Sequence, residues 1–187
     1  QVAERGLVLA RDSLELVPVG AQLPGARTRI LSVTYARRSD LGAGVQFDNE
    51  LRRRFTVQSA YVSADDRQPD LSTLRAAAES SDLVVVGSYV NVTAATATAA
   101  PPAAFVSLVS ELLRSHARVV LVSFGSPYIL QYVPDVGTYL VAWGGSAASQ
   151  KAAARALLGE IPITGRMPIA VPPSLPLGAG LTRTASR

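Results

Sequence analysis

The side chains that could do chemistry in this 187-residue chain are carboxylates, hydroxyls and arginines. There is no cysteine and a single histidine, His116, which excludes disulfides, thiolate catalysis and metal sites built from cysteine or several histidines. Glycosidases need two carboxyl groups on either side of one sugar bond. Nothing in the spacing pairs any two of the loop carboxylates Asp40, Asp65, Asp66 and Asp135. We therefore predict that this chain holds no catalytic residue, no cofactor and no metal.

Residues 37–44 (RRSDLGAG) form the first loop that could hold a ligand. They follow a predicted strand and open a predicted helix, so the helix N-terminus and two arginines could cradle an anion. The loop lacks the third glycine of a dinucleotide fingerprint and the lysine of a P-loop. A plain tight turn is the favoured interpretation.

The second loop, residues 123–128 (SFGSPY), places Ser126 between a glycine and a proline. The G-x-S-x-G spacing of a nucleophile elbow is missing. His116 precedes the strand that this loop follows, so we expect it at the opposite end of the sheet, where it cannot act as a base for Ser126. We interpret His116 as a helix C-terminal residue that faces the helix dipole.

The third loop is Trp143-Gly144-Gly145-Ser146. Its glycines allow close backbone approach, and the helix N–H groups behind them could meet a ligand or another domain. An ordinary strand-to-helix turn is the favoured alternative. From these loops we take five candidate contacts with a cleft or another domain: Ser126, Tyr128, Trp143, Gly144 and Ser146.

The net charge of +4 comes almost entirely from arginines that are scattered along the chain, with Lys151 the only lysine. Nucleic-acid binders gather basic residues on one face, so we expect no nucleic-acid partner. No apolar run approaches the roughly 20 residues that span a bilayer, and no signal peptide opens the chain. The start at Gln1 rather than methionine suggests a processed or trimmed piece.

Apolar runs alternate with helical patterns along the chain. Outside the main strands and helices, we expect an irregular stretch at 18–24, a loop at 93–100, a short last strand at 167–171 and a loose terminus after Gly178. The strands are expected at 30–36, 56–62 (nearer an edge), 83–90, 119–124 and 138–143. The helices are expected at 2–12, 45–55, 70–81 (with Asp70 as N-cap), 101–115 and 148–158 (ending at Gly159).

Alternation of strands and helices with short connections predicts parallel pairing through crossovers. The expected fold is an α/β, three-layer α/β/α sandwich of the flavodoxin-like kind, with a mostly parallel open sheet of about five or six strands. Ligands of such sheets sit at the carboxyl ends of the strands.

Several motifs in the second half go beyond this pattern. They are VSFGSPY at 122–128, VPD at 133–135, YLVAW at 139–143, QKAAARALLGE at 150–160 and PITGRMP at 162–168. Together, over about Leu83 to Pro172, they resemble the C-terminal domain of glycoside hydrolase family 3. Residues 3–19 resemble the segment that links the family's barrel to this domain. The resemblance implies that residues 1–24 lead in from an N-terminal (β/α)8 barrel and that residues 25–187 form the α/β sandwich domain.

In that family the barrel carries the aspartate nucleophile, and in the β-glucosidase branch the second domain adds the acid/base glutamate from the loop after the strand that corresponds to 83–90. Residues 91–104 (NVTAATATAAPPAA) contain no carboxylate. The chain therefore looks like the β-N-acetylglucosaminidase branch, where the barrel supplies the acid/base group. In that branch the second domain is a companion to the barrel.

The resemblance implies a non-catalytic C-terminal domain of a β-N-acetylhexosaminidase or related β-glycosidase, one that supports the barrel and borders its substrate cleft. Its expected partners are the barrel of the same polypeptide and, through the parent enzyme, carbohydrate. The alternatives are a stand-alone flavodoxin-like small-molecule-binding module and a protein-interaction module.

Overall fold

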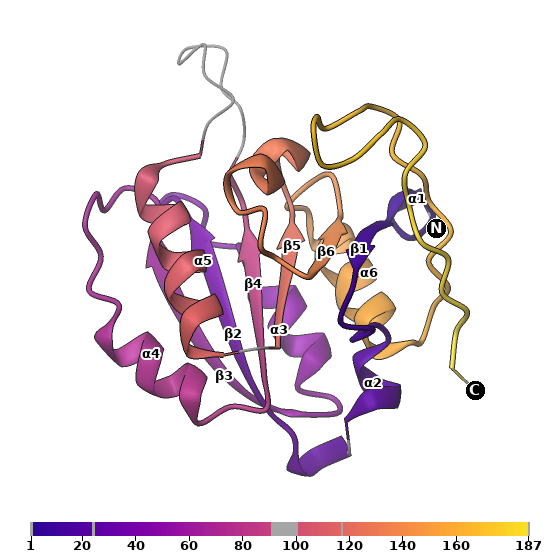
Figure 1. Ribbon diagram of the computed structural model, residues 1–187. Coiled ribbons are helices and arrows are strands. Elements are labelled where there is room, and N and C mark those ends of the chain that lie inside the picture. Colours follow the sequence, from indigo (N-terminus) through magenta and orange to yellow (C-terminus); the bar gives the residue numbers. More distant parts are fainter. Residues whose placement is uncertain (1, 24, 91–100, 117, 187) are drawn as a thin grey trace.

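The computed structural model describes residues 2–23, 25–90, 101–116 and 118–186 (Figure 1). Strands and helices alternate along most of the chain, with two short 3-10 helices (η) between them. The strands are β1 (Val8–Asp12), β2 (Arg29–Ala36), β3 (Thr56–Ser63), β4 (Leu83–Ser88), β5 (Val119–Ser123) and β6 (Thr138–Val141). The helices are α1 (Val2–Gly6), α2 (Val19–Gln22), η1 (Gly25–Arg27), α3 (Val45–Leu51), α4 (Ser72–Glu79), α5 (Ala103–Ser115), η2 (Pro127–Tyr132) and α6 (Ala147–Leu158).

The six strands form one sheet in the order β1-β6-β5-β4-β2-β3. Every neighbouring pair is parallel except β1 and β6, which are antiparallel. Counted among themselves, the five parallel strands follow the order 2-1-3-4-5 of flavodoxin-like sheets. The predicted mostly parallel open sheet is confirmed.

Helices cover both faces of the sheet, which confirms the three-layer sandwich. Figure 1 shows α4 and α5 in front of the sheet and α3 and α6 behind it. The strands divide their side chains between two apolar cores accordingly. On β4, Leu83 and Val85 belong to the core with α3 and α6, and Val84 and Val86 belong to the core with α4 and α5. A continuous apolar run is thus what a strand buried on both faces requires.

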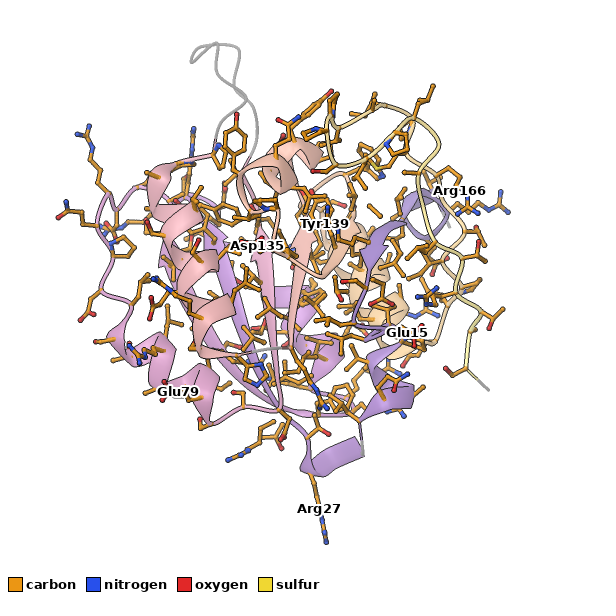
Figure 2. All side chains as sticks on the ribbon, viewed as in Figure 1. Glu15, Arg27, Glu79, Asp135, Tyr139 and Arg166 are labelled. Atoms are coloured by element: carbon orange, nitrogen blue, oxygen red, sulfur yellow. The ribbon has the colours of Figure 1, made fainter. Side chains whose placement is uncertain are left out.

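Charged side chains project from separate parts of the surface. Arg27 lies at the bottom of Figure 2, Glu79 on α4, and Arg166 at the far right, so these charges do not gather on one face. Tyr139 shows the opposite placement: it lies inside the fold, fully buried, and its hydroxyl donates to the carbonyl oxygen of Pro127 at 2.9 Å.

The predicted helix over 2–12 is wrong. The helix α1 ends at Gly6, and residues 8–12 form β1, which pairs with β6 and adds the antiparallel edge. The reason is that neighbouring residues bury opposite faces: Leu9 enters the core with α3 and α6, and Val8 enters the core with α4 and α5. Only an extended chain sends adjacent side chains to opposite sides. That residues 1–24 lead in from a barrel stays a prediction.

The loose terminus predicted after Gly178 is also wrong. The backbone N–H of Leu181 donates to the carbonyl oxygen of Leu9 at 2.7 Å, and Ile163 and Arg183 exchange two backbone hydrogen bonds of 2.9 Å. The tail therefore runs along the outer edge of β1. The strand predicted at 167–171 is replaced by short backbone pairs, and Val171 forms an isolated bridge with Leu175.

Asp12 holds the tail to the sheet. Its carboxylate is completely buried and accepts hydrogen bonds from the backbone N–H groups of Leu16 (2.9 Å) and Val17 (3.2 Å) and from the hydroxyl of Thr138 (3.0 Å). The guanidinium of Arg183 completes the set at 2.9 Å. Residues more than 100 positions apart thus share one buried charge, which local sequence patterns cannot reveal.

The remaining differences are small. The segment 18–24 contains the single turn α2, and the helix expected over 45–55 ends at Leu51. The helix predicted over 70–81 spans Ser72–Glu79, with Leu71 and not Asp70 at the N-cap position. The Asp70 carboxylate accepts a hydrogen bond of 2.9 Å from the N–H of Ser72. The strand predicted nearer an edge is β3, at the end of the sheet. The loop predicted at 93–100 lies outside the described residues.

Candidate functional site

The place to look for a ligand is the carboxyl edge of the sheet, next to the boundary between β2 and β4. From there the chain leaves toward opposite faces, to α3 after β2 and to α5 after β4. Open α/β sheets bind ligands in the crevice at such a point. The loops at residues 37–44, 123–128 and 142–146 end at this edge, which is the top of Figure 1.

Tyr89, directly after β4, lies across this crevice. Its hydroxyl accepts a hydrogen bond of 2.9 Å from the backbone N–H of Gly44, and its ring stacks on Phe124 with 4.7 Å between centroids. Burial raises the pKa of the Tyr89 hydroxyl, and the bond from Gly44 partly opposes that rise. Gly145 packs close to the ring as well, because a Cβ there would lie only 2.9 Å from Tyr89. The ring therefore fills the space between Gly44, Phe124 and Gly145.

Gln150 of α6 ties the first loop to the third. Its side-chain oxygen accepts from the N–H groups of Gln46 (3.1 Å) and Phe47 (3.3 Å), and its amide nitrogen donates to the carbonyl oxygens of Gly42 (2.9 Å) and Gly145 (2.8 Å). A glutamine side chain has two donors and two acceptor positions, so all of them are used. The residue is only 2% exposed.

Tyr89 and Gln150 bear directly on whether residues 37–44 could bind an anion. The N–H groups that open α3 already donate to the hydroxyl of Tyr89 and the amide oxygen of Gln150. The turn itself needs Gly44, which has φ +78° and would place a Cβ 2.1 Å from the hydroxyl of Thr34. The structure therefore supports the tight-turn interpretation.

One of the two arginines of this loop, Arg38, faces acidic residues on the next strand-to-helix connection. The Arg38 guanidinium pairs with Asp66 at 2.7 Å, and its backbone N–H donates to the Asp65 carboxylate at 2.9 Å. The carbonyl of Arg37 accepts from the hydroxyl of Tyr61 at 2.5 Å. These contacts join the 37–44 loop to β3 and to the loop that follows β3 at the surface.

Ser126 acts as a cap. It is 6% exposed, and its hydroxyl accepts a hydrogen bond of 3.3 Å from the N–H of Tyr128. Its own backbone N–H donates to the carbonyl oxygen of Val90 at 2.8 Å. The Ser123 hydroxyl donates to the Ser126 carbonyl at 2.9 Å. The loop is thus held in place from within. Tyr128 is half-buried and lies on η2 at the same edge.

Trp143 has an unusual backbone, with φ +65° in the left-handed region. Its indole N–H donates to the carbonyl oxygen of Gly6 at 2.8 Å, so it anchors the end of α1 to the carboxyl edge. Ser146 caps α6 by accepting from the N–H of Ser149 at 3.2 Å. A Cβ on Gly144 would meet only the Ser149 hydroxyl, at 3.9 Å. Of the three candidates here, Trp143 carries the strain typical of positions with a specific task.

His116 and Asp135 lie at the amino edge, away from these loops. His116 ends α5, and its Nε2 lies 3.0 Å from the carbonyl oxygen of Ser81. Both residues border a hollow of about 590 Å³ with Leu14 and Leu113. The structure therefore does not bring His116 to Ser126. Within the described part of the chain, no group of three or more histidine, aspartate or glutamate side chains could hold a metal ion.

Sequence reasoning missed Tyr89, Phe124 and Gln150, which fill the crevice. Tyr89 and Phe124 look like ordinary strand-end residues, and Gln150 belongs to an alanine-rich helix. A polar residue on the buried side of α6 would have been the one available signal. Three of its four partners lie 103 to 108 positions away and follow only from the fold. None of the described helices is long and apolar enough to cross a membrane.

No protein-family model and no curated protein sequence matches this chain. Solved structures do. A fungal multi-domain GH3 beta-N-acetylglucosaminidase is 22% identical with a TM-score of 0.66, over 88% of this chain and 17% of its own. A beta-glucosidase from Listeria innocua in complex with glucose is 18% identical with a TM-score of 0.70, over 88% and 25%.

A glycoside hydrolase family 3 beta-N-acetylglucosaminidase from Paenibacillus sp. str. FPU-7 is 16% identical with a TM-score of 0.62, over 100% of this chain and 32% of its own. This chain therefore spans less than a third of the length of the glycosidases named here. At these identities the likeness establishes the fold: the α/β sandwich of this chain is one that recurs as a part of larger β-glycosidases.

Proposed function

We propose that this chain is the non-catalytic C-terminal domain of a β-N-acetylhexosaminidase or a related β-glycosidase, and that it supports a catalytic (β/α)8 barrel of the same polypeptide. The observation that carries the proposal is the filled crevice. Tyr89 and Gln150 use the N–H groups and the space that a ligand of this fold would take. The likeness to parts of larger glycosidases and the motifs over about Leu83 to Pro172 supply the context.

The carboxyl edge is the proposed docking side. Large apolar side chains are exposed there: Leu41 is 87% exposed, Val45 45% and Trp143 37%. The anchored end of α1 lies at the same edge, because Trp143 binds the carbonyl of Gly6. A barrel that precedes α1 would therefore be tethered beside these side chains, and burying them would stabilise the contact.

The candidate contacts divide into two roles under this proposal. Tyr128, Trp143, Gly144 and Ser146 face the docking side and border the substrate cleft of the barrel. Ser126 acts through its cap, which positions Tyr128. Carbohydrate is then a ligand of the whole enzyme, with this domain as one wall of the cleft.

The test compares the chain alone with the longer polypeptide that includes the barrel, using a chromogenic N-acetylglucosaminide. We expect no turnover from the chain alone and turnover from the longer protein. Leu41→Asp should weaken docking in the longer protein and lower its unfolding temperature, whereas Arg27→Asp, at an exposed residue on the opposite end of the sheet (Figure 2), is the control. Turnover by the chain alone, lost when one of its own carboxylates is changed, would overturn the proposal.

A stand-alone small-molecule module is the second candidate that the fold allows. Nucleotide binding at the N-terminus of α3 is disfavoured, because the N–H groups there already donate to Tyr89 and Gln150. Calorimetry with mononucleotides and with simple sugars separates the two candidates. Micromolar nucleotide binding would favour the second one.

A further inference from the structure

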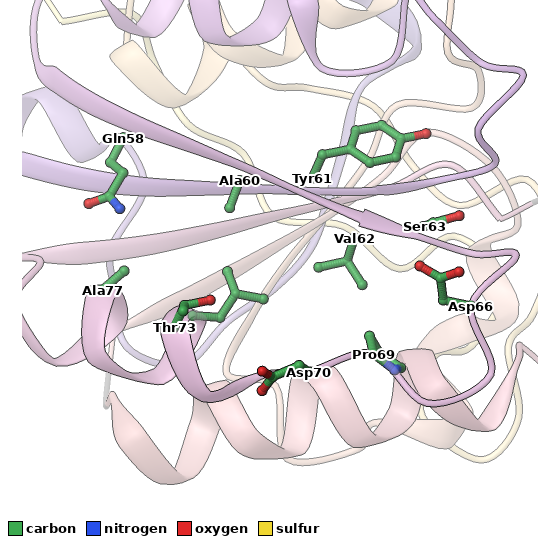
Figure 3. A pocket seen from close by; sticks show the side chains of 11 residues that line it. Gln58, Ala60, Tyr61, Val62, Ser63, Asp66, Pro69, Asp70, Thr73 and Ala77 are labelled. Carbon is green, nitrogen blue, oxygen red and sulfur yellow. The ribbon is translucent and has the colours of Figure 1, made fainter.

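Two hollows in the described surface differ in what borders them. The hollow of about 280 Å³ at the β3 edge of the sheet is lined by residues between positions 58 and 77, including Gln58 and Thr73 (Figure 3). The hollow of about 530 Å³ at α1 is lined by residues from positions 3 to 160, which come from α1, from α3 and α6, and from the turns that end those two helices. The second hollow therefore depends on how α1 lies against the rest of the domain.

The helix α1 has few means of its own to hold that position. It has five residues, none of them buried, and Val2 is 90% exposed. A helix this short is not stable alone in water. Contacts from other elements must therefore fix its place.

The first contact comes from the loop between β6 and α6. The indole N–H of Trp143 donates to the carbonyl oxygen of Gly6, the last residue of α1, at 2.8 Å. Trp143 takes a left-handed backbone conformation, φ +65°, which costs free energy in a residue with a side chain. The ring lies beside Gly6, where a Cβ would come within 3.9 Å of the indole Cδ1. A strained residue thus holds the end of the helix from which the chain enters β1.

The second contact comes from α6. The Arg155 guanidinium pairs with the Glu4 carboxylate at 2.6 Å, and its Nε also pairs with Glu160 at 3.2 Å. Glu160 meets Arg53 at 3.4 Å, and Arg53 meets Glu50 at 2.6 Å. These charges form one series of ion pairs from α1 across α6 to α3. Such a network stabilises a geometry more than an isolated surface pair does.

We propose that Trp143 and Arg155 are positioning residues that hold α1 as a rigid tether, so that the barrel proposed to precede α1 is carried in one orientation. This inference rests on the proposed function. The two contacts come from different elements and reach α1 at two points, Gly6 and Glu4, which prevents the helix from turning about either one. Loss of one contact should free α1 without unfolding the domain, because no residue of α1 is buried.

The first test uses the 187-residue chain and follows hydrogen exchange of residues 3–7 by mass spectrometry. Trp143→Phe keeps an aromatic ring and removes the N–H, and Arg155→Gln removes the charge that pairs with Glu4. Each change should speed the exchange of these amides about fivefold, because α1 loses one hydrogen bond or ion pair.

Arg75→Gln is the matched control. Arg75 is also a helix arginine with two carboxylate partners, Glu79 at 3.1 Å and Glu111 at 3.7 Å, and both lie on the opposite face of the sheet from α6. The control should leave the exchange of residues 3–7 unchanged. Arg155→Lys keeps the charge and should restore slow exchange. Trp143→Gly accepts the left-handed backbone without strain but lacks the indole, so it should exchange as fast as Trp143→Phe.

The second test uses the longer polypeptide that includes the barrel. Arg155→Gln is the variant to use there, because Arg155 lies on α6 and is not one of the candidate cleft contacts. The KM for a chromogenic N-acetylglucosaminide should rise while kcat is kept, since the reacting groups belong to the barrel and one wall of the cleft has moved. Small-angle X-ray scattering should show a wider spread of distances between the two domains. Arg75→Gln should change neither result.

The results distinguish the tether from the function on which it rests. No turnover by the unsubstituted longer polypeptide would overturn the proposed function and the tether with it. Turnover with a KM and a scattering profile that Arg155→Gln leaves unchanged would overturn the tether alone. Unchanged exchange of residues 3–7 in both Trp143→Phe and Arg155→Gln would also overturn it. Circular dichroism confirms that each variant is folded.

Discussion

Replacing Gln150 by leucine probes the crevice most directly. The change keeps the size of a buried side chain and removes its four hydrogen bonds, leaving the N–H groups of Gln46 and Phe47 and the carbonyls of Gly42 and Gly145 without this partner. At about 1 kcal/mol net for each bond, the free energy of unfolding should fall by about 4 kcal/mol. For a domain of this size that lowers the unfolding temperature by roughly 8–16 °C.

The assay is urea unfolding followed by circular dichroism and by the fluorescence of Trp143, the only tryptophan. The matched control is Gln58→Leu on the exposed face of β3, which should change the free energy of unfolding by less than about 0.5 kcal/mol. A loss of less than about 1 kcal/mol for Gln150→Leu would refute the reasoning, because the four bonds would then contribute almost nothing.

Gln150→Glu adds a pH test of the same geometry. A carboxylate there would face the carbonyl oxygens of Gly42 and Gly145 in a buried position, which raises its pKa in the folded state above the unfolded value of about 4.3. Folding then favours the protonated form. The variant should be nearly as stable as the original protein below that pH, and it should lose stability as the pH rises.

Three further changes test other parts of the fold. Arg183→Ala takes the cation from the buried Asp12, which keeps three other donors, so unfolding should become easier by about 2–3 kcal/mol and protease should cut the tail sooner, while the exposed Arg67→Ala changes neither. Tyr35→Phe should be neutral or stabilising by up to about 1 kcal/mol in chemical denaturation, since the buried Tyr35 hydroxyl has no hydrogen-bond partner in the described structure. Burial raises the pKa of Tyr35 to about 12 and that of Tyr89 above its ordinary value. Folded pKa values above unfolded ones mean that stability is complete below pH 10 and falls as the pH rises beyond it, and a urea midpoint unchanged between pH 9 and pH 12 would contradict this.

The elements with the strongest local patterns were predictable. The run at 83–90 is apolar on both faces and forms the central strand β4, and Gly159 ends α6 at φ +79° as expected of a helix terminator. The first strand was not predictable. Residues 8–12 are short and their apolar positions fit a helix as well as a strand, and only pairing with β6 selects the extended form.

The candidate loops were found because strand ends in an α/β sheet meet at one edge, which is a property of the fold class. What fills the space between them was not found. Tyr89 meets Gly44 across 45 residues, and Gln150 meets Gly42 across 108. Hydrogen bonds over such distances leave no periodic trace in the chain.

The amino-acid sequence by itself determined the class of the fold, through its alternating apolar runs. It also limited the side chains that could act in catalysis, because there is no cysteine, one histidine, and no carboxylate in residues 91–104. These are consequences of composition and of short-range pattern. The tertiary structure alone decided that the crevice at the carboxyl edge is filled, that Asp12 holds the C-terminal tail, and that β3 remains an open edge. Each of these depends on which distant side chains meet after folding, and that is set by the packing of the whole sheet.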